Sequence, residues 1–141
     1  ILVLLENNVD MRFKMKNKEF SNIRHHLEKS QKQLAKLLCV STKAVQSYEQ
    51  GWRQIPPHQE QQMLLLLSLK SFSNRNIQPC WEIKDCPGKW RDTCIVWELQ
   101  ARHFCWLING TSCQGKVQKN WNEKVKICRE CKIFKSVLPN I

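Results

Sequence analysis

The sequence predicts a mainly α fold, with a helical N-terminal domain followed by a small, irregular, cysteine-rich C-terminal domain. Apolar residues recur at helical spacing as far as residue 69, which favours four or five short helices in the first half. Seven of the eight cysteines and five of the six tryptophans lie beyond residue 79, where regular periodicity fades. A polar segment that ends in proline, residues 72–79, separates the two parts and is typical of a linker.

Two helices are predicted before residue 39. The first spans about 18–29, where apolar residues recur three and four positions apart: Phe20, Ile23 and Leu27. Ser30 begins the second helix, because a serine hydroxyl can accept a free backbone N–H at a helix N-terminus. The apolar face of this second helix comes from three leucines, Leu34, Leu37 and Leu38.

A third and a fourth helix follow. Ser41 is the N-cap of the third, and Gly51 stands just past its end, where a left-handed residue is favoured. The inward face of the third helix is expected to consist of Ala44, Val45 and Tyr48. The prolines at 56 and 57 end one element and begin another, and a leucine-rich fourth helix, apolar nearly all round, covers 63–69.

The chain is basic in both halves. Its 23 Lys and Arg residues against 12 Asp and Glu give a net charge of +11. Such a surface suits a polyanion, because neutralised phosphates release counterions. The run 12–18 is predicted to belong to a flexible, solvated N-terminal arm, 1–17, with DNA contact as the alternative. No apolar run approaches the about 20 residues of a membrane-spanning helix, so no membrane association is expected.

Residues 30–53 have the layout of a helix-turn-helix DNA reader. Over 23–69 the chain resembles the Cro/C1-type, or XRE, family, and the shared residues are Gln31, Gln33, Leu34, Ala35, Val40, Ser41, Val45, Ser47, Glu49 and Gly51. The resemblance implies a lambda-repressor-like domain over 18–71 that binds double-stranded DNA as a homodimer. Cys39 departs from the family pattern, which usually has glycine at that turn position.

Seven DNA contacts are implied by this resemblance. Ser41 would lie at the groove-entering end of the third helix, and Gln31 and Arg53 would contact phosphates. The side chains implied to face base edges are Thr42, Lys43, Gln46 and Ser47. Their chemistry is suitable, because lysine can donate to guanine O6 or N7 and glutamine can pair with adenine N6 and N7.

The cysteines favour a metal site over disulfides, because a DNA-binding motif in the same chain indicates the reducing cytosol. The spacing of Cys128 and Cys131 lets both thiolates reach one metal. The other gaps are long, which suits an iron–sulfur cluster at least as well as zinc. Seven candidate ligands exceed the four that one site needs: Cys80, Cys86, Cys94, Cys105, Cys113, Cys128 and Cys131.

Residues 80–135 resemble the two-CW domain of anaerobic bacteria, and 136–141 form a tail. The matching residues are Cys80, Trp81, Glu82, Ile83, Cys86, Pro87, Cys94, Cys105, Trp106, the run 109–111, Cys113 and the run 128–131. The two Cys-Trp pairs lie 25 positions apart and suggest duplicated hairpins or turns. This resemblance implies no established chemistry.

Together these features predict a bacterial, cytoplasmic, nucleoid-associated transcriptional regulator with a sensory domain that binds an iron–sulfur cluster or zinc, the cluster being slightly favoured. One alternative is a DNA-binding protein with purely structural zinc, such as a constitutive repressor or an antitoxin. A redox or electron-transfer protein ranks last. No carboxylate pair, Ser/His/Asp set or glycine-rich phosphate loop supports an enzyme or a small-molecule substrate.

Overall fold

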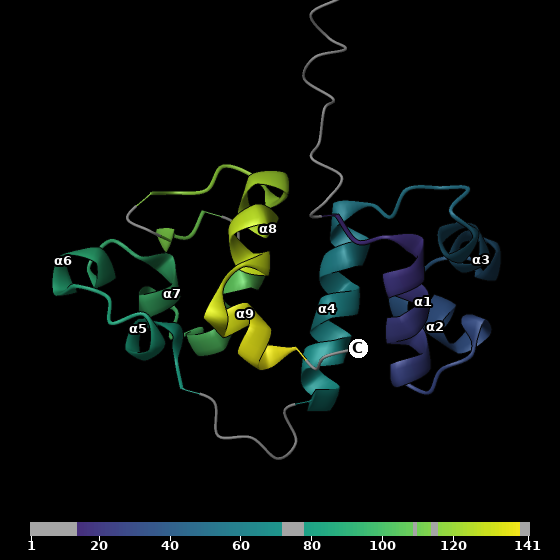
Figure 1. Cartoon of the computed structure of the whole chain (residues 1–141), viewed down its shortest axis with the longest axis horizontal. Coiled ribbons are helices and arrows are strands. Elements are labelled where there is room, and N and C mark those ends of the chain that lie inside the picture. Colours follow the sequence, from purple (N-terminus) through teal and green to yellow (C-terminus); the bar gives the residue numbers. More distant parts are fainter. Residues whose placement is uncertain (1–13, 72–77, 109, 114–115, 139–141) are drawn as a thin grey trace, which may run out of the picture. The chain divides into compact units, whose positions relative to one another are not determined.

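The computed structural model describes residues 14–71, 78–108, 110–113 and 116–138, and these ranges are mainly α-helical, as the sequence predicts (Figure 1). They contain no β-strand. The chain divides into two compact units, whose main bodies are Met15–Arg75 and Asn76–Val137. None of the described helices is both long and apolar enough to cross a membrane. The predicted arm, linker and tail fall largely outside the described ranges.

The first unit contains four helices that surround one apolar core. They are α1 (Asn17–His26), α2 (Gln31–Leu38), α3 (Thr42–Gln50) and α4 (Pro57–Ser71). α3 and α4 each contact both α1 and α2. At the centre, the Phe20 ring meets the Tyr48 ring edge-on, with 5.5 Å between the ring centroids. The inward face predicted for α3 is confirmed, because Ala44, Val45 and Tyr48 are buried.

Serine caps fix the beginnings of α2 and α3, as predicted. Ser30 Oγ accepts the Gln33 backbone N–H at 3.1 Å, and Gln33 Oε1 accepts the Ser30 backbone N–H at 2.9 Å, which completes a capping box. Ser41 Oγ accepts the Ala44 backbone N–H at 3.0 Å. Gly51 ends α3 in the left-handed conformation, with φ of 78°.

The first helix begins about where predicted but ends earlier. α1 stops at His26 instead of continuing to about residue 29, because the chain turns at Glu28, whose φ is 58°, to reach the Ser30 cap. The Lys70 ammonium donates to the His26 carbonyl at 2.8 Å and so satisfies one free group at the helix end. At the other end, Met15 is buried and belongs to the folded unit, not to a flexible arm.

α4 begins at Pro57, before the predicted leucine-rich stretch 63–69, and its first turn is polar. Leu69 is 55% exposed, whereas the first turn buries the polar residues Gln59 and Glu60. Glu60 Oε1 accepts the Met15 backbone N–H at 3.2 Å, and Gln59 Nε2 donates to the Leu38 carbonyl at 3.5 Å. These polar contacts join α4 to the segment before α1 and to the last residue of α2.

The second unit is built from short helices. They are α5 (Cys80–Ile83), α6 (Gly88–Arg91), α7 (Ile95–Glu98), the 3-10 helix η3 (Arg102–Leu107), α8 (Trp121–Arg129) and α9 (Lys132–Val137), which passes the predicted domain end at 135. η3 is central and contacts α5, α7, α8 and α9. Its fully buried Trp106 meets the Phe134 ring edge-on, with centroids 5.9 Å apart. The two Cys-Trp pairs lie in α5 and η3, so the repeated feature is a helical turn and not a hairpin.

Candidate functional site

α3 presents a polar face opposite its buried one. Lys43 and Gln46 are exposed, and Thr42 and Ser47 are partly exposed. The Ser47 hydroxyl donates to the Lys43 carbonyl at 2.9 Å, so Ser47 offers only acceptor lone pairs outward. The exposed Ser41 hydroxyl accepts its capping bond and keeps its own proton for donation. The four side chains predicted to face DNA bases therefore share one helix with the cap residue.

Gln31, predicted to contact a phosphate, lies in a cluster centred on Glu49. Its Nε2 donates to Glu49 Oε2 at 2.9 Å, which leaves the second amide hydrogen for another acceptor. Arg24 donates two hydrogen bonds to the same carboxylate. Its Nε donates to Oε1, and its Nη2 donates to Oε2 at 3.2 Å. Glu49 thereby joins α1, α2 and α3 through one side chain.

The Glu49 carboxylate stays charged in this cluster. Its side chain is only 8% exposed, and burial alone would raise its pKa. The hydrogen bonds from Arg24 and Gln31 outweigh burial, so the pKa of Glu49 lies below its usual value. The sequence gives no sign of this three-helix contact, although Glu49 is one of the residues shared with the XRE family.

The outer surface around α2 and α3 is basic. Glu49 is the only acid between residues 29 and 59, and Arg24 neutralises it. Exposed lysines and an arginine cover the same stretch: Lys29, Lys32, Lys36, Lys43 and Arg53. The Arg53 guanidinium lies 5.7 Å from the Tyr48 ring centroid, just past the end of α3. This unit thus offers cations and hydrogen-bonding groups beside one helix, which suits a polyanion.

Trp52 is an exposed aromatic residue that sequence reasoning did not assign to the site. It follows Gly51 at the end of α3 and is 78% exposed. Because the Trp52 side chain is exposed to solvent next to the basic residue Arg53, it is available for contact with a partner.

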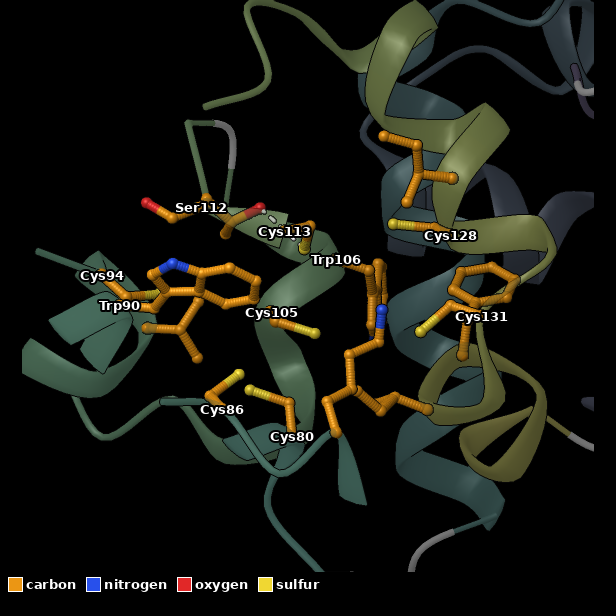
Figure 2. Close-up of a pocket in the computed structure, with 16 residues that line it drawn as sticks. Cys80, Cys86, Trp90, Cys94, Cys105, Trp106, Ser112, Cys113, Cys128 and Cys131 are labelled. Carbon is orange, nitrogen blue, oxygen red and sulfur yellow. Dashed lines mark hydrogen bonds between the residues drawn. The ribbon is translucent and has the colours of Figure 1, made fainter. Parts of the chain in front are cut away.

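The second unit contains a cavity of about 350 Å³ that is lined by all seven of its cysteines (Figure 2). These cysteines come from every part of the unit: α5, the loop after it, the segment before α7, η3, the segment after η3, α8 and the α8–α9 junction. The remaining lining is mostly apolar, with Trp90, Trp106, Ile133 and Phe134 among its residues. All eight cysteines are free thiols, and Cys39 lies apart, at the turn after α2.

The most deeply buried thiols are protonated at neutral pH. A hydrogen bond with Cys80 and burial both raise the pKa of Cys105 far above its usual value. Burial raises the pKa of Cys128 to about 12. Burial and the neighbouring Cys94 also raise the pKa of Cys86. A bound metal must therefore displace protons from this cavity.

Two lysines bring positive charge to the thiols. Lys84 lines the cavity, and its pKa is raised because the nearby sulfurs of Cys131 and Cys113 outweigh the effect of burial. Lys124 is 1% exposed, and its ammonium donates to the Thr111 hydroxyl. Both lysines are placed to stabilise negative charge in the cavity.

The arrangement differs from a compact single-ion site. Among the residues that the structure describes, no three His, Cys, Asp or Glu side chains are placed to hold one metal ion. His103 is not part of the cavity lining and packs against Phe104, with ring centroids 4.6 Å apart. Comparison with protein-family models, with curated proteins and with solved structures finds no match to this chain.

Proposed function

We propose that this chain is a bacterial, cytoplasmic DNA-binding transcriptional regulator whose cysteine-lined cavity binds a metal or an iron–sulfur cluster. The observation that carries the DNA-binding part is the α2–turn–α3 segment. There, serine-capped helices flank a left-handed turn, and a polar, basic face lies opposite a buried one. This is the layout with which helix-turn-helix proteins read DNA.

In this proposal α3 enters the major groove. Lys43 would donate to guanine O6 or N7, and Gln46 would pair with adenine. Arg53 would contact a phosphate just past the helix end, and Gln31 would use the amide hydrogen that Glu49 leaves free. The Glu49 cluster would fix the angle between α2 and α3, so that base and phosphate contacts form together.

The chain would act as a homodimer on two half-sites about one helical turn apart. The cavity would supply the signal, since loss or gain of a bound metal changes the stability of the unit that holds it. The alternative is structural zinc that only stabilises the second unit. The burial of Cys105 and Cys128 beside the core residue Trp106 favours this alternative.

Lys43→Ala tests the DNA-binding part. Sites would first be selected from random duplex DNA, and affinity for a selected and an unrelated duplex would then be measured at one salt concentration. We expect Lys43→Ala to weaken selected-site binding by about 1–3 kcal/mol and to leave most non-specific binding intact. Lys126→Ala, at an exposed lysine on α8 in the second unit, removes the same charge as a control. Selection that returns no sequence preference would overturn the proposal.

A further inference from the structure

The cysteines of the cavity differ in which part of it they line. Cys80, Cys86 and Cys94 also line a smaller adjoining hollow of about 30 Å³. The other four, Cys105, Cys113, Cys128 and Cys131, line the main cavity and not the smaller hollow, although a hydrogen bond joins Cys105 to Cys80. Figure 2 shows the side chains of these four cysteines on different sides of Trp106, with Cys94 beside Trp90. Four thiols at one space are the number that an iron–sulfur cluster takes.

The size of the space favours a polynuclear group over a single ion. Zinc holds each sulfur ligand at about 2.3 Å, so a zinc site leaves no hollow between its thiolates. Here the thiols enclose about 350 Å³, within the range of about 300–1,000 Å³ found for ligand and cofactor pockets.

Lys124 indicates that the occupant is anionic. A buried ammonium is costly without a counter-charge, and no carboxylate among the described residues forms an ion pair with it. Its neighbours are Cys105 and Cys128, on which its charge acts. The Thr111 hydroxyl that accepts from Lys124 lies 3.5 Å from Cys113 Sγ and can donate its own proton there. Thiolates at these positions would supply the missing negative charge.

Trp106 supplies a hydrogen-bond donor that has no acceptor. The residue is 0% exposed and lines the cavity, yet its indole N–H has no partner among the residues described. A buried donor without a partner calls for an explanation, and an ion or cofactor that belongs beside it is one. Sulfur atoms of a cluster accept such hydrogen bonds, and these bonds help to set its reduction potential.

We propose that the cavity binds an iron–sulfur cluster through Cys105, Cys113, Cys128 and Cys131, with Lys124 as its buried counter-charge and the Trp106 indole N–H as a donor to a cluster sulfur. This inference rests on the proposed metal-binding role of the cavity and is independent of DNA binding. Cys80, Cys86 and Cys94 lie outside the ligand set in this assignment.

Anaerobic purification of the full chain tests the ligand set by iron, sulfide and zinc content. We expect iron and sulfide in the native protein and in Cys94→Ala, and loss of both in Cys113→Ala. Cys94 and Cys113 are both half-buried, so the two variants form a matched pair. The helical content of each variant, measured by circular dichroism, shows whether it folds. Stoichiometric zinc without sulfide would overturn the inference and leave metal binding in place. Retention of iron and sulfide by Cys113→Ala would also overturn it.

A second measurement tests the roles of Lys124 and Trp106. Removal of a nearby cation or of a donor to sulfur disfavours the more negative, reduced cluster, so Lys124→Met and Trp106→Phe should each lower the reduction potential. Lys126→Met on the exposed side of α8 and Trp90→Phe are the matched controls. Lys124→Arg should restore the native potential. Equal potentials in all these variants would show that neither residue faces the cluster.

Discussion

Glu49 is the single residue whose side chain joins three helices of the first unit. Because its hydrogen bonds to Arg24 and Gln31 hold the pKa below the ordinary value of 4.5, the charged carboxylate stabilises the fold. That contribution is complete above about pH 4.5 and fades as the pH falls through the lowered pKa. We expect Glu49→Gln to reduce the unfolding free energy by about 1–3 kcal/mol at pH 7 and by less near pH 3. Urea unfolding at both pH values measures this.

Glu28→Gln is the control for that experiment. Glu28 also forms an ion pair, with Lys70 at 3.2 Å, but its side chain is 85% exposed. An exposed pair of this kind contributes about 0–1 kcal/mol. If Glu49→Gln cost no more than Glu28→Gln, or cost the same at both pH values, the carboxylate cluster would have no role in stability.

Cys39 stands in the left-handed conformation, with φ of 53° and ψ of 44°. A Cβ atom is strained there, whereas glycine is not, so Cys39→Gly should stabilise the first unit by about 1 kcal/mol. Thermal unfolding followed by circular dichroism checks this. Cys39→Ala keeps the Cβ atom and should give no such gain. Equal effects of the two substitutions would mean that the turn is unstrained.

Residue-level features were predictable where they depend on nearby sequence. The Ser30 and Ser41 caps and the left-handed Gly51 follow from residues within one helical turn, and the structure confirms them. The contacts of Glu49 and Lys124 join residues 13 to 25 positions apart, so no local pattern encodes them. For the same reason the sequence named all seven cysteines but gave no indication of how they group.

At the scale of elements, apolar faces and end signals in the sequence decided which helices could be predicted. α2, α3 and α4 carry apolar faces and end signals, and their existence was predicted. α5, α6 and α7 have four residues each, far below the about 12–15 at which an isolated helix becomes marginally stable. Such short helices depend on tertiary contacts, such as those of α5 with η3 and α9 and those of α7 with η3. Apolar periodicity within the segment therefore does not predict them.

The second unit should depend on its bound metal for stability. Its helices are short, and a metal that bridges η3, α8 and the α8–α9 junction would add binding free energy to folding. We expect removal of the metal by a chelator under reducing conditions to lower the melting temperature of this unit and to leave the first unit unchanged. Calorimetry of loaded and stripped chains measures both transitions. Identical melting temperatures of the second unit in the loaded and stripped chains would mean that the bound metal does not stabilise it.

At the scale of the whole molecule, one chain combines a basic surface around α3 with a thiol-lined cavity in a separate compact unit. Two such sites influence each other only if occupancy of one changes the free energy of binding at the other. A regulator that senses through the cavity requires this coupling, whereas a protein with structural zinc does not. The coupling is therefore the property that separates the two proposed functions.

We expect loaded and stripped chains to differ in affinity for a selected DNA site by about 5- to 150-fold, the usual range of allosteric coupling. Fluorescence anisotropy under anaerobic conditions measures both affinities. Because coupling is reciprocal, the same DNA should change the affinity for the metal by the same factor. Cys128→Ser, which lacks one of the four proposed ligands, should show no difference between the two treatments, and this controls for the chelator. Equal DNA affinities for the loaded and stripped native chain would identify the cavity as a structural site.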